Sequence, residues 1–147
     1  MNHVPLVFND PDNFTRRMFF EEKMATAAID ARGNGSANPT QDFLFDIARS
    51  ANNSEQLVRD AWNAYESPVD YGLVPWGLEK VAAMIAADFP TKVYYVPYRN
   101  NAFDTHVYQG DLHARLWSYT SDHIAAFVRD MERLGRGDDV VVMVFSE

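Results

Sequence analysis

An almost continuous apolar run, Asp139–Phe145 (DVVVMVF), limits the possible folds of this chain more than any other segment. Valine dominates it, as is typical of a strand buried on both faces of a parallel sheet. Thr91–Tyr98 (TKVYYVPY) has the same character, and Asp111–Leu134 between them carries a helical pattern. Two strands joined by a helix this long are expected to lie parallel, with a right-handed crossover. The sequence therefore predicts an α/β fold built on a β-α-β unit.

The intervening helix has the clearest periodicity. Its expected apolar stripe consists of Leu112, Leu116, Thr120, Ile124, Phe127, Val128, Met131 and Leu134, and Gly135 supplies the stop signal. The charged residues Arg129, Asp130, Glu132 and Arg133 are interpreted as a solvated face. His123, in the middle of the helix, is interpreted as structural.

The first half of the chain reads as helical. An Asn or Asp followed by proline is a helix start signal, because the side chain caps the first turn and proline fits its first position. The expected helices run from about Pro11 to Ile29, from Asn38-Pro39 to Tyr65, and from Pro75 to Pro90. We therefore expect one domain, with a mainly helical part at 1–74 and an α-β-α-β core at 75–147.

Two strands are few for a parallel sheet, which normally has several and is covered on both faces. The sequence also stops on the last residues of the second strand. We therefore expect a partial domain, an incomplete piece of a larger sheet whose neighbouring strands come from elsewhere.

Composition excludes several classes of function. The 147 residues carry a net charge of −8 without a cluster of Lys and Arg, which argues against nucleic acid or an anionic membrane as the main partner. The absence of cysteine excludes disulfides, thiolate metal sites and a cysteine nucleophile. Any metal would be held by His, Asp, Glu or neutral oxygens. Apolar runs fall far below the ~18 residues that a membrane span requires.

The candidate chemistry lies in the loop after the first predicted strand. Phosphate-binding, dinucleotide-binding, zincin and hydrolase-elbow motifs are absent. Asp104 and His106, two residues apart with Thr105 between them, can reach one hard or borderline cation. The alternative is a hydrogen-bonded network that only caps the loop.

The predicted topology brings other polar residues to the same place. Gln109 follows the first strand and Ser146 and Glu147 follow the second, so all would lie at the carboxyl edge where α/β folds bind ligands. We expect Asp104, His106 and Glu147 to share one crevice. His113 would lie at its rim, or on the surface beside Asp111.

A family resemblance rests on three runs: PWGLEKVAAMIAADFPTKVYYV, then FDTH and AAFVRDM, and finally VVVMVFSE. Together they resemble the bacterial family known as domain of unknown function 1501, whose members look like distant relatives of alkaline phosphatases and sulfatases. The resemblance covers Pro75–Glu147 most specifically. It implies a three-layer α/β sandwich, a metal-dependent hydrolase-like activity, and export from a bacterial cell by the twin-arginine route.

The resemblance also implies roles for individual residues. Asp104 and His106 match metal ligands, and Glu147 matches either a third ligand or a hydrogen-bond acceptor beside the ligands. Thr105, Gln109, His113 and Ser146 match residues around the metal or substrate. It implies a divalent metal cofactor and a small-molecule or polymeric phosphate or sulfate ester as substrate. The family's other motifs, including a glycine-rich segment with an Asp, are absent, so the nucleophile is unassigned and this chain alone is expected to be inactive. The competing interpretation is a non-catalytic binding module.

Overall fold

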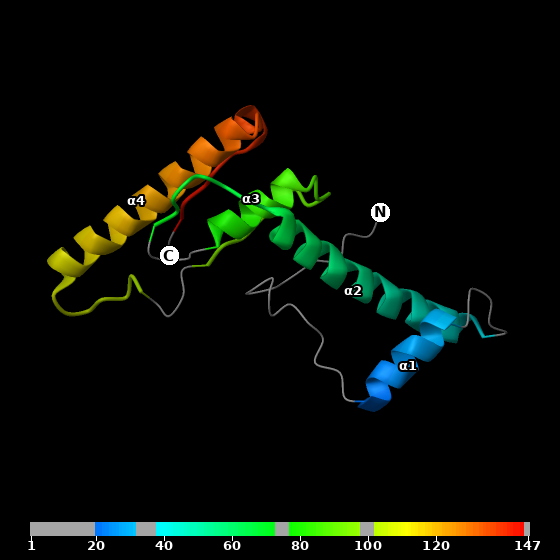
Figure 1. Ribbon diagram of the computed structural model, residues 1–147. Coiled ribbons are helices and arrows are strands. Elements are labelled where there is room, and N and C mark those ends of the chain that lie inside the picture. The colour runs from blue at the N-terminus through cyan, green and yellow to red at the C-terminus, as the bar shows by residue number, and fades with distance from the viewer. Residues whose placement is uncertain (1–19, 32–37, 73–76, 98–101, 146–147) are drawn as a thin grey trace. The chain divides into compact units, whose positions relative to one another are not determined.

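The computed structural model describes residues 20–31, 38–72, 77–97 and 102–145. Regular structure in these ranges is helical and comprises α1 (Phe20–Ala31), α2 (Pro39–Ala64), α3 (Leu78–Ala86), α4 (Gln109–Arg133) and the short 3-10 helix η2 (Gly137–Asp139) (Figure 1). The chain divides into two compact units, Met1–Asn63 and Ala64–Glu147.

The predicted α/β fold is wrong for the part of the chain that the structure describes. Residues 91–97 and 140–145 form no strand, so the expected β-α-β unit and the three-layer sandwich are absent over these ranges. The backbone of Val140 is extended, with φ −123° and ψ 130°. A strand requires in addition a hydrogen-bonded neighbour. The local sequence thus favours extended backbone without producing a sheet.

The side chains of these two segments are exposed, which agrees with the absence of a sheet in this part of the structure. Val93 is 83% exposed and Val141 is 93% exposed, although both were expected inside a sheet. The rings of Tyr95 and Phe145 approach to 6.2 Å between centroids. The segments therefore meet through side chains, and we find no backbone ladder between them among the described residues.

In the first unit, the sequence signal for the start of α2 is confirmed. Asn38 caps the helix: its side-chain oxygen accepts a hydrogen bond from the Thr40 N–H at 3.0 Å, and its carbonyl accepts bonds from Gln41 and Asp42. Pro39 occupies the first helical position, where its missing N–H costs nothing. The predicted apolar stripe is less buried than expected, because Leu44 and Ile47 are at least half exposed. The predicted start of the first helix near Pro11 lies outside the described residues.

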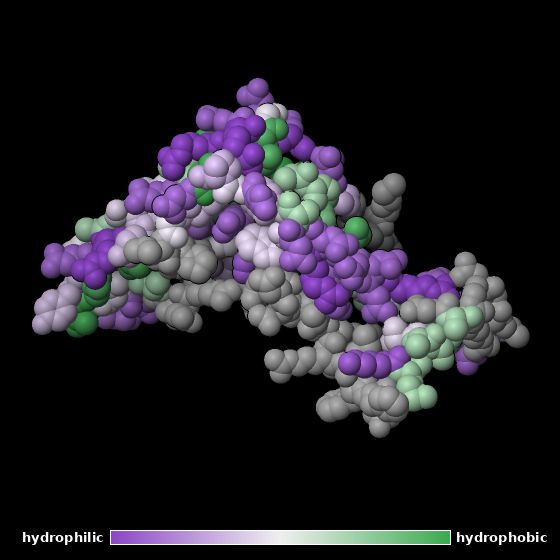
Figure 2. All heavy atoms as spheres, in the orientation of Figure 1, coloured by the Kyte–Doolittle hydropathy of each residue, from purple (hydrophilic) through white to green (hydrophobic). Residues whose placement is uncertain are grey.

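The second unit is organised by the packing of α3 on α4. Its core contains Tyr71, Ala82, Ile85, Ala126, Phe127 and Met131. Alanines at 82 and 126 let the two helices approach closely, while Phe127 and Met131 are the large apolar side chains that α4 contributes to this core. Tyr65, Val69, Tyr94 and Val140 pack around this core from the connecting segments. The side of this unit that is seen in Figure 2 is mostly hydrophilic.

Helices α3 and α4 end in the same hydrogen-bonded motif. At the end of α4, the Gly135 N–H donates to Glu132 and the Arg136 N–H donates to Met131, which is a Schellman motif. At the end of α3, Asp88 and Phe89 donate to Ile85 and Met84 in the same pattern. The guanidinium of Arg136 lies 2.7 Å from the Asp88 carboxylate. The predicted stop at Gly135 is thus confirmed, and an ion pair joins the two helix ends.

Replacing Gly135 by alanine should lower the free energy of unfolding by about 1 kcal/mol. Gly135 has φ +70°, a left-handed conformation that costs an L-residue roughly 1–2 kcal/mol. An added Cβ would meet nothing within 4 Å, so the cost is conformational only. Gly110→Ala is the matched control, because Gly110 lies in the first turn of α4, also in open space, without a positive φ. In urea denaturation, the Gly110→Ala control should raise the free energy of unfolding by about 0.5–1 kcal/mol. Equal effects of the two changes would contradict this account.

Candidate functional site

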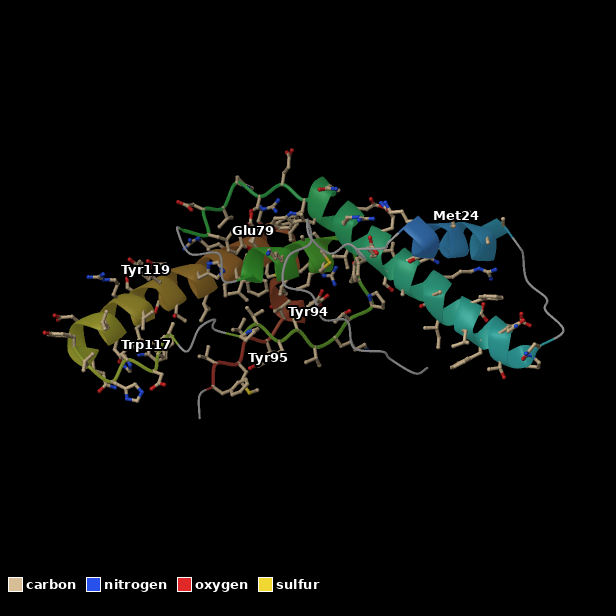
Figure 3. The ribbon with its side chains drawn as sticks, turned by 90° about the horizontal axis from the view of Figure 1, so that it is seen from below. Met24, Glu79, Tyr94, Tyr95, Trp117 and Tyr119 are labelled. Atoms are coloured by element: carbon tan, nitrogen blue, oxygen red, sulfur yellow. The ribbon has the colours of Figure 1, made fainter. Side chains whose placement is uncertain are left out.

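The loop at 102–108 is fixed against the start of α4 by Phe103. Its ring lies 5.2 Å from that of Trp117 and 5.7 Å from that of His113, measured between centroids. The Nε2–H of His113 donates a hydrogen bond of 2.9 Å to the Phe103 carbonyl oxygen. His113 therefore holds the backbone directly before Asp104, which gives it a positioning role (Figure 3 shows Trp117 beside this loop).

Asp104 and His106 lie together on this loop. The Asp104 Oδ1 is 2.6 Å from the His106 Nε2, and both side chains are more than half exposed. A tight turn brings them together: the Val107 N–H donates to the Thr105 carbonyl, and His106 has φ +36°. Tyr108, at the start of α4, is also left-handed at φ +53°. Backbone strain of this kind tends to accumulate at functional loops.

The donor atoms suit a divalent cation only in part. A carboxylate and an imidazole are ligands of zinc and related metals. In the described ranges, however, no group of three His, Asp or Glu side chains is placed to hold a metal ion. Asp104 and His106 thus provide two ligands, which is fewer than a closed metal site requires.

The other predicted site residues fall into two sets. Gln109 is the exposed first residue of α4, and the Thr105 hydroxyl is buried without a hydrogen-bond partner among the described residues. Ser146 and Glu147 lie outside those residues, and so does the predicted crevice shared by Glu147 and His106.

The interpretation of Asp130 as part of a solvated face is wrong. Asp130 is fully buried, and its carboxylate accepts hydrogen bonds from the hydroxyls of Tyr65 and Tyr71, the second at 2.7 Å. The Nε–H of Arg133 donates to its other oxygen at 2.8 Å. A sequence signal did exist, because Asp130 follows Phe127 by three residues and His123 by seven, which places all three on one helix face.

Burial and hydrogen bonding shift the pKa of Asp130 in opposite directions. Desolvation raises the pKa of its carboxyl, but the hydrogen bonds from Tyr65, Tyr71 and Arg133 prevail, so the pKa lies below its ordinary value of 3.8. On the tyrosine side, desolvation and then the bond to Asp130 raise the pKa of Tyr65 to about 12. The same causes raise the pKa of Tyr71. The cluster therefore holds one carboxylate and two neutral phenols at neutral pH.

His123, interpreted from the sequence as structural, is buried in the second unit. It is 2% exposed, and its Nδ1–H donates a hydrogen bond of 2.8 Å to the Tyr71 carbonyl. The rings of Tyr71 and His123 meet edge to face at 5.3 Å. Its Nε2 atom is buried without a hydrogen-bond partner among the described residues. Desolvation lowers the pKa of the imidazole below its ordinary value of 6.5.

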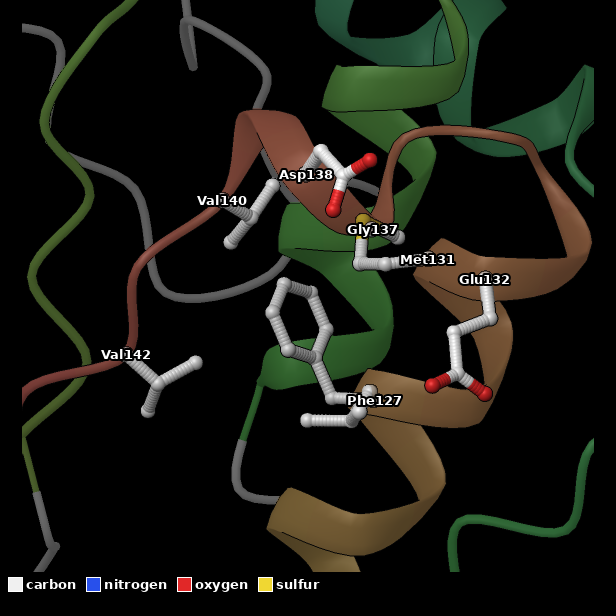
Figure 4. Close-up of a pocket in the computed structure, with 8 residues that line it drawn as sticks. Phe127, Met131, Glu132, Gly137, Asp138, Val140 and Val142 are labelled. Carbon is white, nitrogen blue, oxygen red and sulfur yellow. The ribbon is translucent and has the colours of Figure 1, made fainter.

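A shallow pocket of about 280 Å³ lies over the C-terminal half of α4. Phe127, Met131, Val140 and Val142 give it an apolar lining, and Glu132 and Asp138 also line it (Figure 4). The Asp104–His106 loop precedes the first turn of α4, whereas this pocket begins at Phe127. At 1.5 Å per residue the two are well separated along the helix. The pocket is therefore not part of the candidate metal site.

Comparisons with protein-family models, with curated proteins and with solved structures find no match to this chain. Among the residues that the structure describes, no helix combines the length and the apolar character needed to cross a membrane.

Proposed function

We propose that this chain is a homologue of alkaline phosphatase-like and sulfatase-like hydrolases, and that Asp104 and His106 bind a divalent metal ion. The observation that carries the proposal is that both side chains lie together on one exposed loop, with the Asp104 Oδ1 at hydrogen-bond distance, 2.6 Å, from the His106 Nε2. A metal ion would replace the proton shared by these two atoms. The F-D-T-H resemblance supports the same two residues as ligands. The proposed reaction is metal-assisted hydrolysis of a phosphate or sulfate ester.

In this proposal, residues of this chain bind the metal ion and hold the loop that carries its ligands. Asp104 supplies a carboxylate oxygen and His106 a ring nitrogen, while His113 holds the loop through the Phe103 carbonyl. A divalent cation, when bound, supplies Lewis-acid polarisation of an ester oxygen. Gln109, Thr105 and Ser146 remain proposed substrate or supporting residues, and Glu147 the proposed third ligand.

Metal binding by the purified chain should be weak and should depend on both loop residues. Two side-chain donors do not complete a coordination sphere, so most of the affinity of a closed site is missing. We expect Mn²⁺ to broaden the imidazole NMR signals of His106 selectively, and Asp104→Asn to reduce that broadening severalfold. Asp122→Asn, which removes an exposed carboxylate from α4, is the matched control and should have no effect.

Two results would contradict the proposal. One is broadening of His106 that is unchanged in Asp104→Asn, because the carboxylate would then not be a ligand. The other is no effect of Mn²⁺ or Zn²⁺ on His106 at millimolar concentration. Turnover of an aryl phosphate by this chain is expected to be undetectable, so the metal titration is the decisive measurement.

The alternative is a non-catalytic binding module, and one observation favours it. The apolar side chains of residues 141–145 are all exposed, with Val141, Met143 and Phe145 each more than 60% accessible. Contiguous exposed apolar residues mark surfaces that contact other macromolecules. If the metal titration leaves His106 unaffected, a contact of this segment with an apolar partner surface becomes the better proposal.

A further inference from the structure

A non-helical segment, residues 65–72, connects α2 to the residues preceding α3 and lies across α4. We call it the strap. Tyr71 belongs to the core cluster, and Tyr65 and Val69 pack against it. Local hydrogen bonds shape the strap: the Val69 N–H donates to the Ser67 hydroxyl and the Gly72 N–H to the Asp70 carboxylate. These bonds lie within the strap and do not attach it to α4.

Hydrogen bonds attach the strap to two side chains of α4. The hydroxyls of Tyr65 and Tyr71 donate to Asp130, and the Tyr71 carbonyl accepts from His123. Asp130 and His123 are seven residues apart, two turns of one helix, so they hold the strap at two successive points. Both side chains are fully or almost fully buried. A change in the protonation state of either side chain would therefore alter the hydrogen bonds that hold the strap.

We propose that the strap is a pH-sensitive latch, in which protonation of His123 releases residues 65–72 from α4. In the closed state the Nδ1–H is already used on Tyr71, so an added proton must go to Nε2. That atom has no acceptor among the described residues, and protonation there would bury a charged donor without a partner. A buried unpaired charge is costly, and opening the strap relieves that cost by hydration.

The groups that face His123 define the pH range of this latch. Tyr71 faces it from the strap and stays neutral throughout, because its pKa is raised. Burial lowers the pKa of His123 and prevails over two opposing effects, the hydrogen bond to the Tyr71 carbonyl and the negative charge of Glu79 on α3. Asp130 is deprotonated in this range, since its pKa lies below 3.8. The strap is therefore most firmly closed above pH 6.5, and loosens as the pH falls from 6.5 toward the lowered pKa of His123.

The chain contains no cysteine, so a single engineered thiol reports on the strap alone. Val69→Cys places that thiol on the partly buried face of the strap, and Val93→Cys places one at an 83% exposed position of the same unit. The ratio of their labelling rates with a methanethiosulfonate reagent removes the intrinsic pH dependence of the chemistry. We expect this ratio to be constant from pH 7.5 to 6.5. Below 6.5 it should rise by up to about tenfold per pH unit, because opening takes up one proton.

Three variants make the test specific. His123→Gln, which cannot be protonated, should abolish the rise between pH 6.5 and 5.0, while His106→Gln should leave it unchanged because His106 is exposed. Glu79→Gln should extend the rise to lower pH, since removing the carboxylate lowers the pKa of His123 in the closed state further. Tyr71→Phe should raise the ratio at every pH and keep its slope.

The proposal is overturned by a flat ratio in the parent chain, by a rise that persists in His123→Gln, or by a rise in Glu79→Gln that levels off at a higher pH than in the parent chain. Loss of far-UV helicity together with the rise would also overturn it, because unfolding of α4 would then replace opening of the strap. If His123→Gln does not fold, the Glu79→Gln measurement decides the question.

Discussion

Replacing Asp130 by alanine is expected to lower the free energy of unfolding by about 3–5 kcal/mol. The change leaves the buried hydroxyls of Tyr65 and Tyr71 without their acceptor and removes the partner of Arg133. An unsatisfied buried polar group costs about 1–3 kcal/mol, and breaking a buried charged network costs about 3–5 kcal/mol. Urea denaturation followed by circular dichroism at pH 7 measures the difference.

Asp122→Ala is the matched control, since it removes a carboxylate from the same helix at an exposed position, and should change stability by no more than about 0.5 kcal/mol. Tyr65→Phe and Tyr71→Phe should cost about 1 kcal/mol each in the parent chain and little in the Asp130→Ala background, because the acceptor is already gone. A cost below 1 kcal/mol for Asp130→Ala would show that water reaches the carboxylate and that the network does not hold the strap.

The pH dependence of this variant has a defined sign. The folded-state pKa of Asp130 is lowered, so its contribution to stability is present above pH 3.8 and is lost as the pH falls below that value. The difference in the free energy of unfolding between the parent chain and Asp130→Ala should therefore become smaller below pH 3.8.

Replacing Phe127 by alanine should be as damaging, at about 3–5 kcal/mol, for a different reason. Phe127 is 2% exposed in the core cluster with Ala82, Ile85 and Met131, and its removal leaves a cavity that neighbouring alanines cannot fill. We expect a lower urea midpoint without loss of helical signal in the native baseline.

Val128→Ala, at the next position of α4, is the control for Phe127→Ala. Val128 is 42% exposed, so truncating it removes little buried area and should cost less than about 1 kcal/mol. Similar costs for the two changes would mean that the α3–α4 packing is loose, and that the core assigned to the second unit is not its main source of stability.

The features that the sequence determined depend on residues close together in the chain. Asn38-Pro39 predicted the start of α2, because an amide side chain caps the turn directly after it. Gly135 predicted the end of α4, because only glycine adopts φ +70° there without strain. The Asp104–His106 contact also spans only two residues. In each case the energy that decides the structure is local.

The tertiary structure decided what depends on distant parts of the chain. An apolar, β-branched run becomes a strand only when a neighbour completes its hydrogen bonds, and Val141 and Met143 have none in the described structure. Asp130 looked like one charge among four on a solvated face, yet Tyr65 and Tyr71, 65 and 59 residues away in sequence, bury it. The pattern of α4 placed Asp130 on the face of His123 and Phe127. Only the path of the strap determined that this face is covered there, because the covering segment lies far away in the sequence.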